Sequence, residues 1–198
     1  MRFKNYLLTF FIIGVLAGCK SSTTEPDTTP KTIMPLKTGN SWVYKSYTIE
    51  PNTGLKIDTK RDFTTTVGAE TLVNGEKWFS ISNFIMPNND EVMVQLKADG
   101  LWLTVDDLPG LLFKYPAQLN STFTNPGGMV TVVSTSAKVE SGGKNYTCYH
   151  YKIQEEVADS DINFYVAPGI GLVKYTSVVG ELGAFYTTSQ ELQSYSLK

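Results

Sequence analysis

The segment Phe164–Tyr175, with the sequence FYVAPGIGLVKY, carries the clearest signal for the fold. Aromatic and β-branched residues, which favour strands, stand on both sides of Pro168-Gly169-Ile170-Gly171. Proline holds φ at about −65° at the start of a turn, and glycine accepts the positive φ values that tight turns need. The segment is therefore predicted to form a β-hairpin in which Pro168, Gly169 and Gly171 are structural turn residues.

The same alternation of turns and short apolar runs continues along the chain from residue 33 onward. Runs rich in Val, Ile, Thr, Tyr and Phe are separated by turn signals such as Asn74-Gly75, Asp99-Gly100, Asn125-Pro126-Gly127-Gly128 and Ser141-Gly142-Gly143. Asn-Gly and Asp-Gly favour hairpin turns. No stretch beyond residue 18 keeps a helical period for three turns. Residues 33–198 are therefore predicted to form a single all-β domain, an antiparallel meander of about 10 to 12 strands.

The domain shows a faint internal repeat. Pro35-Leu-Lys-Thr-Gly-Asn-Ser-Trp42 resembles Pro116-Ala-Gln-Leu-Asn-Ser-Thr-Phe123, and similar strand patterns follow each block. This indicates two pseudo-repeats, about residues 35–110 and 116–198, of five or six strands each; coincidence among β-rich segments is the alternative. The apolar faces of the two sheets either stack as a sandwich or continue round as an open, strongly curved barrel.

The N-terminus has the three parts of an export signal. Arg2 and Lys4 precede an apolar run, Tyr6–Leu16, whose length of about 11 residues suits a signal peptide and is too short for a membrane span. Leu16-Ala17-Gly18-Cys19 resembles the lipobox of bacterial lipoproteins. The resemblance implies that residues 1–18 are removed and that Cys19 is lipidated. An ordinary secretory signal and a transmembrane helix are the alternatives.

Residues 19–32 are predicted to be the lipidated Cys followed by a flexible tether. Beyond Cys19 the stretch reads KSSTTEPDTTPKT and contains no large apolar residue, which is typical of a solvated linker. Lys20 follows the cysteine, without the aspartate that retains proteobacterial lipoproteins at the inner membrane. By analogy, the expected location is the cell envelope, anchored to the outer membrane with the domain on its periplasmic or surface face.

Composition excludes several classes of protein. With 17 Lys and Arg against 19 Asp and Glu, the chain has no excess of basic residues for a nucleic-acid partner. One His and two Cys cannot supply a four-ligand zinc site and a second His site. If Cys19 carries lipid, only Cys148 remains and no intramolecular disulfide forms. No cofactor or metal is expected.

Few residues suggest catalysis. Cys148 and His150, two positions apart on a predicted strand, are the one pair that could activate a thiolate, and a half-exposed strand surface is the simpler interpretation. Asp159 and Asp161 could bind calcium, although no EF-hand pattern surrounds them. Paired carboxylates of a glycosidase cannot be chosen from the sequence. The domain is therefore predicted not to be an enzyme.

Aromatic residues are the main candidates for ligand binding. On a curved sheet such side chains line apolar cavities or stack on sugars; otherwise they fill the core. The candidates are Trp42, Tyr44, Trp78, Trp102, Tyr149 and Tyr151.

Together with Pro35–Trp42 and the C-terminal Glu191–Leu197, the hairpin segment resembles a group of bacterial lipoproteins. Their chains carry a Tyr-x-Ala-Pro-Gly-Val-Gly-Leu-Val hairpin, in which Ile170 here replaces Val, and a last strand with Glu-Leu and Tyr. Some members are similar to the TapB family, which is associated with pilus assembly. The resemblance implies a β-rich periplasmic or surface domain and transfers no catalytic residue.

The sequence thus predicts a lipid-anchored, non-enzymatic envelope protein. Its expected partners are the membrane, through Cys19, and a protein or a hydrophobic or glycan ligand bound on a concave sheet. The alternatives are a periplasmic lipid carrier or chaperone with an open barrel and a hydrolase of envelope glycans.

Overall fold

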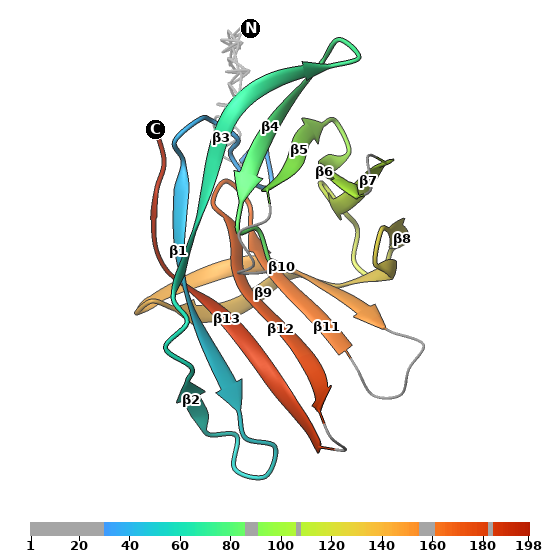
Figure 1. The fold of residues 1–198 in the computed structure, drawn as a ribbon. Coiled ribbons are helices and arrows are strands. Elements are labelled where there is room, and N and C mark those ends of the chain that lie inside the picture. Colours follow the sequence, from blue (N-terminus) through green and yellow to red (C-terminus); the bar gives the residue numbers. More distant parts are fainter. Residues whose placement is uncertain (1–29, 86–90, 106–107, 155–160, 182–183) are drawn as a thin grey trace, which may run out of the picture.

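A computed structural model describes residues 30–85, 91–105, 108–154, 161–181 and 184–198 (Figure 1). The predicted signal peptide, Cys19 and most of the tether lie outside the described residues. The described residues form thirteen strands. They are β1 (Ser41–Ile49), β2 (Lys56–Asp58), β3 (Phe63–Val73), β4 (Glu76–Ser82), β5 (Glu91–Lys97), β6 (Gly100–Val105), β7 (Leu108–Lys114), β8 (Thr122–Asn125), β9 (Gly128–Ser141), β10 (Lys144–Gln154), β11 (Asp161–Ala167), β12 (Gly171–Glu181) and β13 (Ala184–Ser196).

All strands belong to one antiparallel sheet that curves into a nearly closed barrel (Figure 1). From β3 to β7 and from β8 to β13, strands consecutive in the chain pair with each other. β2 and β3 both pair with β1, and β13 pairs with β1 over Ser41–Ile49. Between β7 and β8 the sheet path ends, which leaves one unsealed seam. The all-β antiparallel meander is confirmed, with thirteen strands instead of 10 to 12, and of the two predicted forms the structure shows the barrel.

The two halves of the chain contribute equally to the sheet. The path runs β7-β6-β5-β4-β3-β1 through the first half and β13-β12-β11-β10-β9-β8 through the second, six strands from each. The halves meet at the β1–β13 pair, and the seam lies at their other junction. Duplication of a six-stranded unit would produce this arrangement, and the duplication itself stays a prediction.

The predicted hairpin around Pro168-Gly169-Ile170-Gly171 forms the turn between β11 and β12. Gly169 and Gly171 have φ values of 77° and 111°, and the Ile170 amide donates to the Ala167 carbonyl at 3.0 Å. A Cβ atom at Gly171 would lie 3.0 Å from Cγ of Met34. Glycine at this position therefore allows both the turn and the close approach of residues 30–34, which pack here. We call this end of the barrel the tether end.

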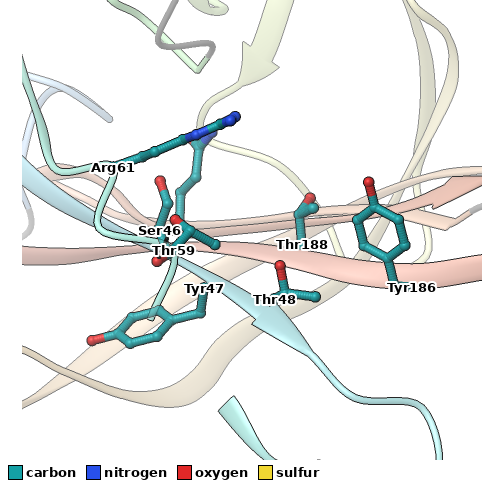
Figure 2. A pocket seen from close by; sticks show the side chains of 8 residues that line it. Ser46, Tyr47, Thr48, Thr59, Arg61, Tyr186 and Thr188 are labelled. Atoms are coloured by element: carbon teal, nitrogen blue, oxygen red, sulfur yellow. Dashed lines mark hydrogen bonds between the residues drawn. The ribbon is translucent and has the colours of Figure 1, made fainter. Parts of the chain in front are cut away.

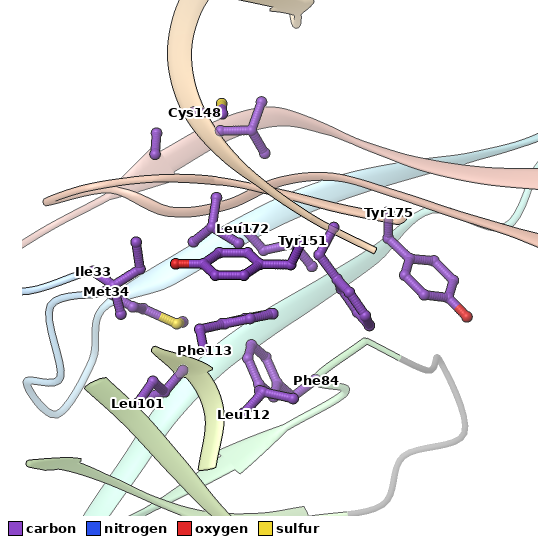
Figure 3. Packing of buried hydrophobic residues seen from close by; sticks show 14 of the residues in the cluster. Ile33, Met34, Phe84, Leu101, Leu112, Phe113, Cys148, Tyr151, Leu172 and Tyr175 are labelled. Carbon is purple, nitrogen blue, oxygen red and sulfur yellow. The ribbon is translucent and has the colours of Figure 1, made fainter. Parts of the chain in front are cut away.

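Aromatic side chains from both halves fill the barrel interior (Figure 3). Phe113 of β7 stacks on Tyr151 of β10 and meets Phe164 of β11 edge-on, with ring centroids 5.3 Å apart in both pairs. Tyr151 also donates a hydrogen bond to the Lys114 carbonyl at 2.7 Å. The core thus joins β7 to β10 and β11 through side chains, near the seam where strand pairing ends.

The tip of the β9–β10 hairpin covers part of the outer surface. Register shifts around His150 bend this hairpin, and the Ser141 hydroxyl donates to the Leu192 carbonyl of β13 at 2.8 Å. Cys148 is fully buried under the hairpin. Figure 3 shows it on the other side of the strands from Tyr151. The barrel therefore has a second, local layer of packing at this place.

Candidate functional site

Three of the six candidate aromatic residues belong to the core. Trp42, Tyr44 and Tyr151 have at most 1% of their surface exposed. The Trp42 indole donates to the Ile170 carbonyl at 2.7 Å, and the Tyr44 hydroxyl donates to the Leu172 carbonyl at 2.8 Å. Their polar atoms are therefore used within the fold, and the structure assigns these residues to packing.

Tyr149 lies beside this core and the two remaining tryptophans lie elsewhere. Tyr149 is partly buried, with its ring centroid 6.0 Å from that of Tyr151. Trp78 and Trp102 fall outside the core cluster, where Lys97 Nζ lies 6.0 Å and 4.9 Å from their ring centroids. A cavity of about 400 Å³ borders Trp78. Because Trp78 is only 4% exposed and Lys97 lies over the ring of Trp102, both residues suit sugar stacking less well than exposed, bare rings would.

A second cavity lies on the inner face of β1 and β13, where the side chains of that face change from apolar to polar. Successive side chains on one face of a strand are two residues apart, so Ser46 and Thr48 continue the face that carries Tyr44. The same face of β13 runs from Leu192 in the core to Gln190 and beyond. The cavity measures about 460 Å³ and is lined by Ser46, Tyr47, Thr48, Thr59, Arg61, Tyr186, Thr188 and Gln190. We call it the hydroxyl pocket.

The side chains of the hydroxyl pocket converge (Figure 2). Figure 2 shows the Thr48, Thr188 and Tyr186 oxygens directed to the side on which Arg61 extends, while Tyr47 turns away. Thr188 is held in place through its hydroxyl, which lies 3.0 Å from the hydroxyl of Ser177. The lining thus offers hydroxyl groups, one amide, one guanidinium and no carboxylate.

The loop between β2 and β3 is fixed in the position that brings Arg61 to the pocket. Thr59 donates twice to the Ser46 carbonyl, from its amide at 3.1 Å and its hydroxyl at 3.0 Å. Lys60 adopts the left-handed conformation with φ of 58°, and its amide donates to Asp58 Oδ1 at 2.7 Å. Strained backbone of this kind persists where surrounding contacts enforce it. The geometry of the loop is therefore set before any ligand arrives.

The charged side chains of Asp58 and Lys60, close to Arg61 in the chain, pair with each other and not with its guanidinium. Lys45 and Lys60 lie 2.9 Å and 3.0 Å from Asp58 Oδ2. The Lys45 hydrogen bond, followed by bonds from Lys60, holds the pKa of Asp58 well below its usual range. Among the described residues Arg61 forms no ion pair. The pocket therefore carries the charge of Arg61, while Asp58 is neutralised by the two lysines.

On the opposite face of β13, the buried Glu191 is the centre of an ion-pair group that sequence reasoning missed. Its Oε1 lies 2.6 Å from Lys56 Nζ and 3.2 Å from Lys174 Nζ, and it accepts from the Ser189 hydroxyl at 3.1 Å. Burial acts to raise the pKa of Glu191, but the Lys56 hydrogen bond and the two positive charges outweigh it and lower the pKa. The group fastens β2 to β13 and so supports the loop that carries Arg61.

The remaining residues that the sequence suggested for catalysis or calcium binding are Cys148, His150, Asp159 and Asp161. Cys148 is buried, whereas His150 Nε2 lies 2.8 Å from Asn163 Oδ1 with its ring stacked on Tyr165. Burial raises the pKa of the Cys148 thiol to about 12, which does not suit a nucleophile. Asp159 lies outside the described residues, and Asp161 pairs with Lys152 at 2.7 Å.

Neither a cluster of metal ligands nor a membrane-spanning helix is present among the described residues. In the described part of the chain, no group of three or more His, Cys, Asp or Glu side chains is placed to hold a metal ion. No helix there is long and apolar enough to cross a membrane.

The hydroxyl pocket could have been found from sequence alternation. In β1 the even-numbered positions read Trp42, Tyr44, Ser46 and Thr48, so one face changes from aromatic to hydroxyl-bearing. Gln190 and Thr188 repeat the change in β13. Arg61 gave no signal, because only the fold brings its loop to this face.

Comparisons with known proteins give a distant structural likeness. No protein-family model matches the chain, and no curated protein matches it. A candidate exported protein of YmcC-like fold from Bacteroides fragilis is 10% identical, with a TM-score of 0.49 over 83% of this chain and 98% of its own. A candidate lipoprotein from Parabacteroides distasonis is 9% identical, with a TM-score of 0.47 over 84% and 99% of the two chains. Likenesses this distant identify neither a ligand nor an activity.

Proposed function

We propose that the chain is a lipid-anchored, non-enzymatic protein of the bacterial cell envelope that binds a saccharide in the hydroxyl pocket. The observation that carries the proposal is the change along the inner face of β1 and β13 from a filled aromatic core to a cavity of about 460 Å³ lined by hydroxyl groups. Sugars present many hydroxyls, and such a lining offers both donors and acceptors to them.

The packing of the barrel favours this function over a lipid carrier. A carrier needs an apolar cavity, whereas the aromatic rings that could have lined one pack against each other at about 5 to 6 Å between centroids. The lining of the hydroxyl pocket also contains no Asp or Glu. A glycan hydrolase at this place would need two carboxyl groups across the bound sugar. Binding without cleavage is therefore the better supported function.

The position of the pocket suits an anchored protein. Residues 30–34 follow the predicted tether and pack at the tether end, where the Gly169 amide donates to the Thr32 carbonyl at 2.8 Å. Thr48 of the pocket is six residues from Trp42 along β1, a rise of about 20 Å. Figure 1 shows β2 and this part of β1 at the opposite end of the barrel from the start of the described chain. A lipid at Cys19 would therefore attach through the end of the barrel that lies opposite the pocket.

The anchor and the binding function are tested separately. In cell fractionation, Cys19→Ala is expected to move the full chain from the membrane fraction to the soluble fraction. Retention of the variant in the membrane would contradict the lipid anchor. This result does not depend on the ligand.

Binding is tested by calorimetric titration of the full chain with a panel of neutral and acidic oligosaccharides. Thr48→Val removes a pocket hydroxyl with little change of shape and is expected to weaken binding. Thr187→Val is the matched control, since Thr187 neighbours Thr188 on β13 and points to the other face. A panel without any binder would contradict the proposed function.

A further inference from the structure

We infer that the hydroxyl pocket selects saccharides that carry an anionic group, a carboxylate or a phosphate, which Arg61 binds while Gln190 accepts a hydrogen bond from a sugar hydroxyl. The inference rests on the proposed function and goes further by assigning the charge of the ligand and the residue that recognises it.

Arg61 is the first of two unused groups in the pocket. It is the one arginine between Cys19 and Lys198, and the described residues give it no ion pair. A guanidinium presents several donors in a plane and binds carboxylate or phosphate through two parallel hydrogen bonds. Asp62 follows it in the chain but is not among the residues that line the pocket. The pocket thus contains a cation whose preferred partner is absent from its own lining.

Gln190 supplies the second unused group. Its Oε1 atom is buried and has no hydrogen-bond partner among the described residues. A buried acceptor without a donor is costly, so a ligand that donates there gains affinity. An ionised carboxylate has no proton to donate, whereas a sugar hydroxyl has one. The two unused groups together therefore specify a molecule that carries both a negative charge and hydroxyl groups.

The remaining lining fits the same ligand. Ser46 and Thr48 hydroxyls can donate to sugar oxygens and accept from sugar hydroxyls. Tyr186 presents an aromatic ring at the edge of the pocket (Figure 2), a surface on which the apolar face of a sugar ring can lie. A pocket of about 460 Å³ falls in the size range of small-molecule sites.

The inference is tested by calorimetric titration of the full-length protein in detergent. The ligands are tri-galacturonic acid and its full methyl ester, in which esterification removes the negative charges from the same sugar backbone, and glucose 6-phosphate with glucose as the phosphate pair. Inorganic phosphate is titrated as an anion without a sugar. At least one acidic sugar is expected to bind about 10- to 100-fold more tightly than its neutral counterpart, the range typical of one charge-assisted pair. The pair that shows the preference identifies the anion as carboxylate or phosphate.

Variants assign the preference to Arg61. Arg61→Gln is expected to remove the difference between acidic and neutral sugars, and Lys60→Gln is the matched control. Lys60 is the adjacent residue, loses the same charge, contacts Asp58 and does not line the pocket. Gln190→Leu is expected to weaken the binding of acidic and of neutral sugars by the same factor. Thermal unfolding of each variant checks that the fold is kept.

Four results would overturn the inference. They are equal affinity for each acid and its neutral counterpart, phosphate binding as tightly as the acidic sugars, equal losses in Lys60→Gln and Arg61→Gln, and no saccharide binding. In the first three, sugar binding itself survives and the proposed function stands. The fourth removes both.

Discussion

Buried polar atoms at the ends of aromatic side chains connect distant parts of this barrel. The Trp42 indole and the Tyr44 hydroxyl, both on β1, bind carbonyls of residues 170 and 172 across the intervening strand β13. The sequence blocks around Trp42 and around Pro168-Gly169 are therefore joined by hydrogen bonds, as well as by packing around Met34.

Substitution of Trp42 tests this connection. Trp42→Phe removes the donor to the buried Ile170 carbonyl and leaves a small cavity, so the free energy of unfolding is expected to fall by about 1 to 3 kcal/mol. Trp102→Phe is the control, because Trp102 donates to Asp99 near the surface and should lose less than about 1 kcal/mol. Urea unfolding measures both, and equal losses would contradict a structural role for the Trp42 indole.

The Cys148 thiol is expected to be inert in the folded protein. Burial raises its pKa to about 12, so almost no thiolate forms at pH 8. In the Cys19→Ala chain, where Cys148 is the one thiol, a disulfide reagent should react in urea and not under native conditions. Rapid labelling of the native chain would show that the β9–β10 hairpin does not cover this residue.

For a single aromatic residue, the sequence distinguishes poorly between a place in the core and a place in a ligand site. Trp42, Tyr44 and Tyr151 were candidates for both roles, since an inward aromatic residue looks the same whether its neighbour is another ring or a ligand. What decides is the residue facing it across the barrel, such as Phe113 for Tyr151, and that residue is remote in sequence.

Among the elements, β13 holds two functions on its two faces. Gln190 points into the hydroxyl pocket, and the next residue, Glu191, binds Lys56 and Lys174 on the outer face. The strand therefore connects two parts of the structure. One is the ion-pair group that holds β2 against β13, and the other is the cavity that the β2–β3 loop completes.

The ion-pair group predicts how stability depends on pH. The pKa of Glu191 is lower in the folded state than its ordinary value of 4.5, so the unfolded chain binds more protons around that pH. Its contribution is present above pH 4.5 and is lost as the pH falls below it. The free energy of unfolding is expected to decrease from about pH 5 towards pH 3, measured by urea unfolding at several pH values.

Glu191→Gln should reduce that dependence and cost about 1 to 3 kcal/mol at pH 7, because two lysines lose their partner. Asp161→Asn removes an ion pair in which both side chains are more than a third exposed, and it should cost less than about 1 kcal/mol. An unchanged pH profile in Glu191→Gln would assign the slope to other carboxylates.

Hairpins were predictable because their signals are local. Neighbouring strands are connected by Asn74-Gly75, Asp99-Gly100 and Pro168–Gly171. In each, a glycine stands beside another turn-forming residue, which is the pattern that predicts a hairpin turn. The bend of the β9–β10 hairpin was not predictable, since it depends on contacts with β12 and β13 that form only in the complete fold.

Across the whole molecule, one junction between the halves is hydrogen-bonded and the other is not. β1 and β13 pair along their length, while the sheet path ends at β7 and β8. The pairing of the first strand with the last could not be predicted from local pattern, which left sandwich and barrel as equal alternatives.

The unsealed seam predicts a difference in local stability. Amide groups on the free edges of β7 and β8 lack strand partners, so they should exchange hydrogen faster than the paired amides of β1 and β13. Hydrogen exchange read by mass spectrometry on peptides from residues 108–125 and 185–196 compares them. Equal protection of the two junctions would mean that the seam is sealed in solution.

The central claim is that the hydroxyl pocket, and not the aromatic residues, is the ligand site of this barrel. Mapping of amide chemical shifts by NMR during titration with tri-galacturonic acid tests it most directly. We predict shifts confined to residues 46–48, 59–61 and 186–190, with the amides around Trp78 and Trp102 unchanged. Shifts that cluster around those two tryptophans, or the absence of any shift, would contradict the account.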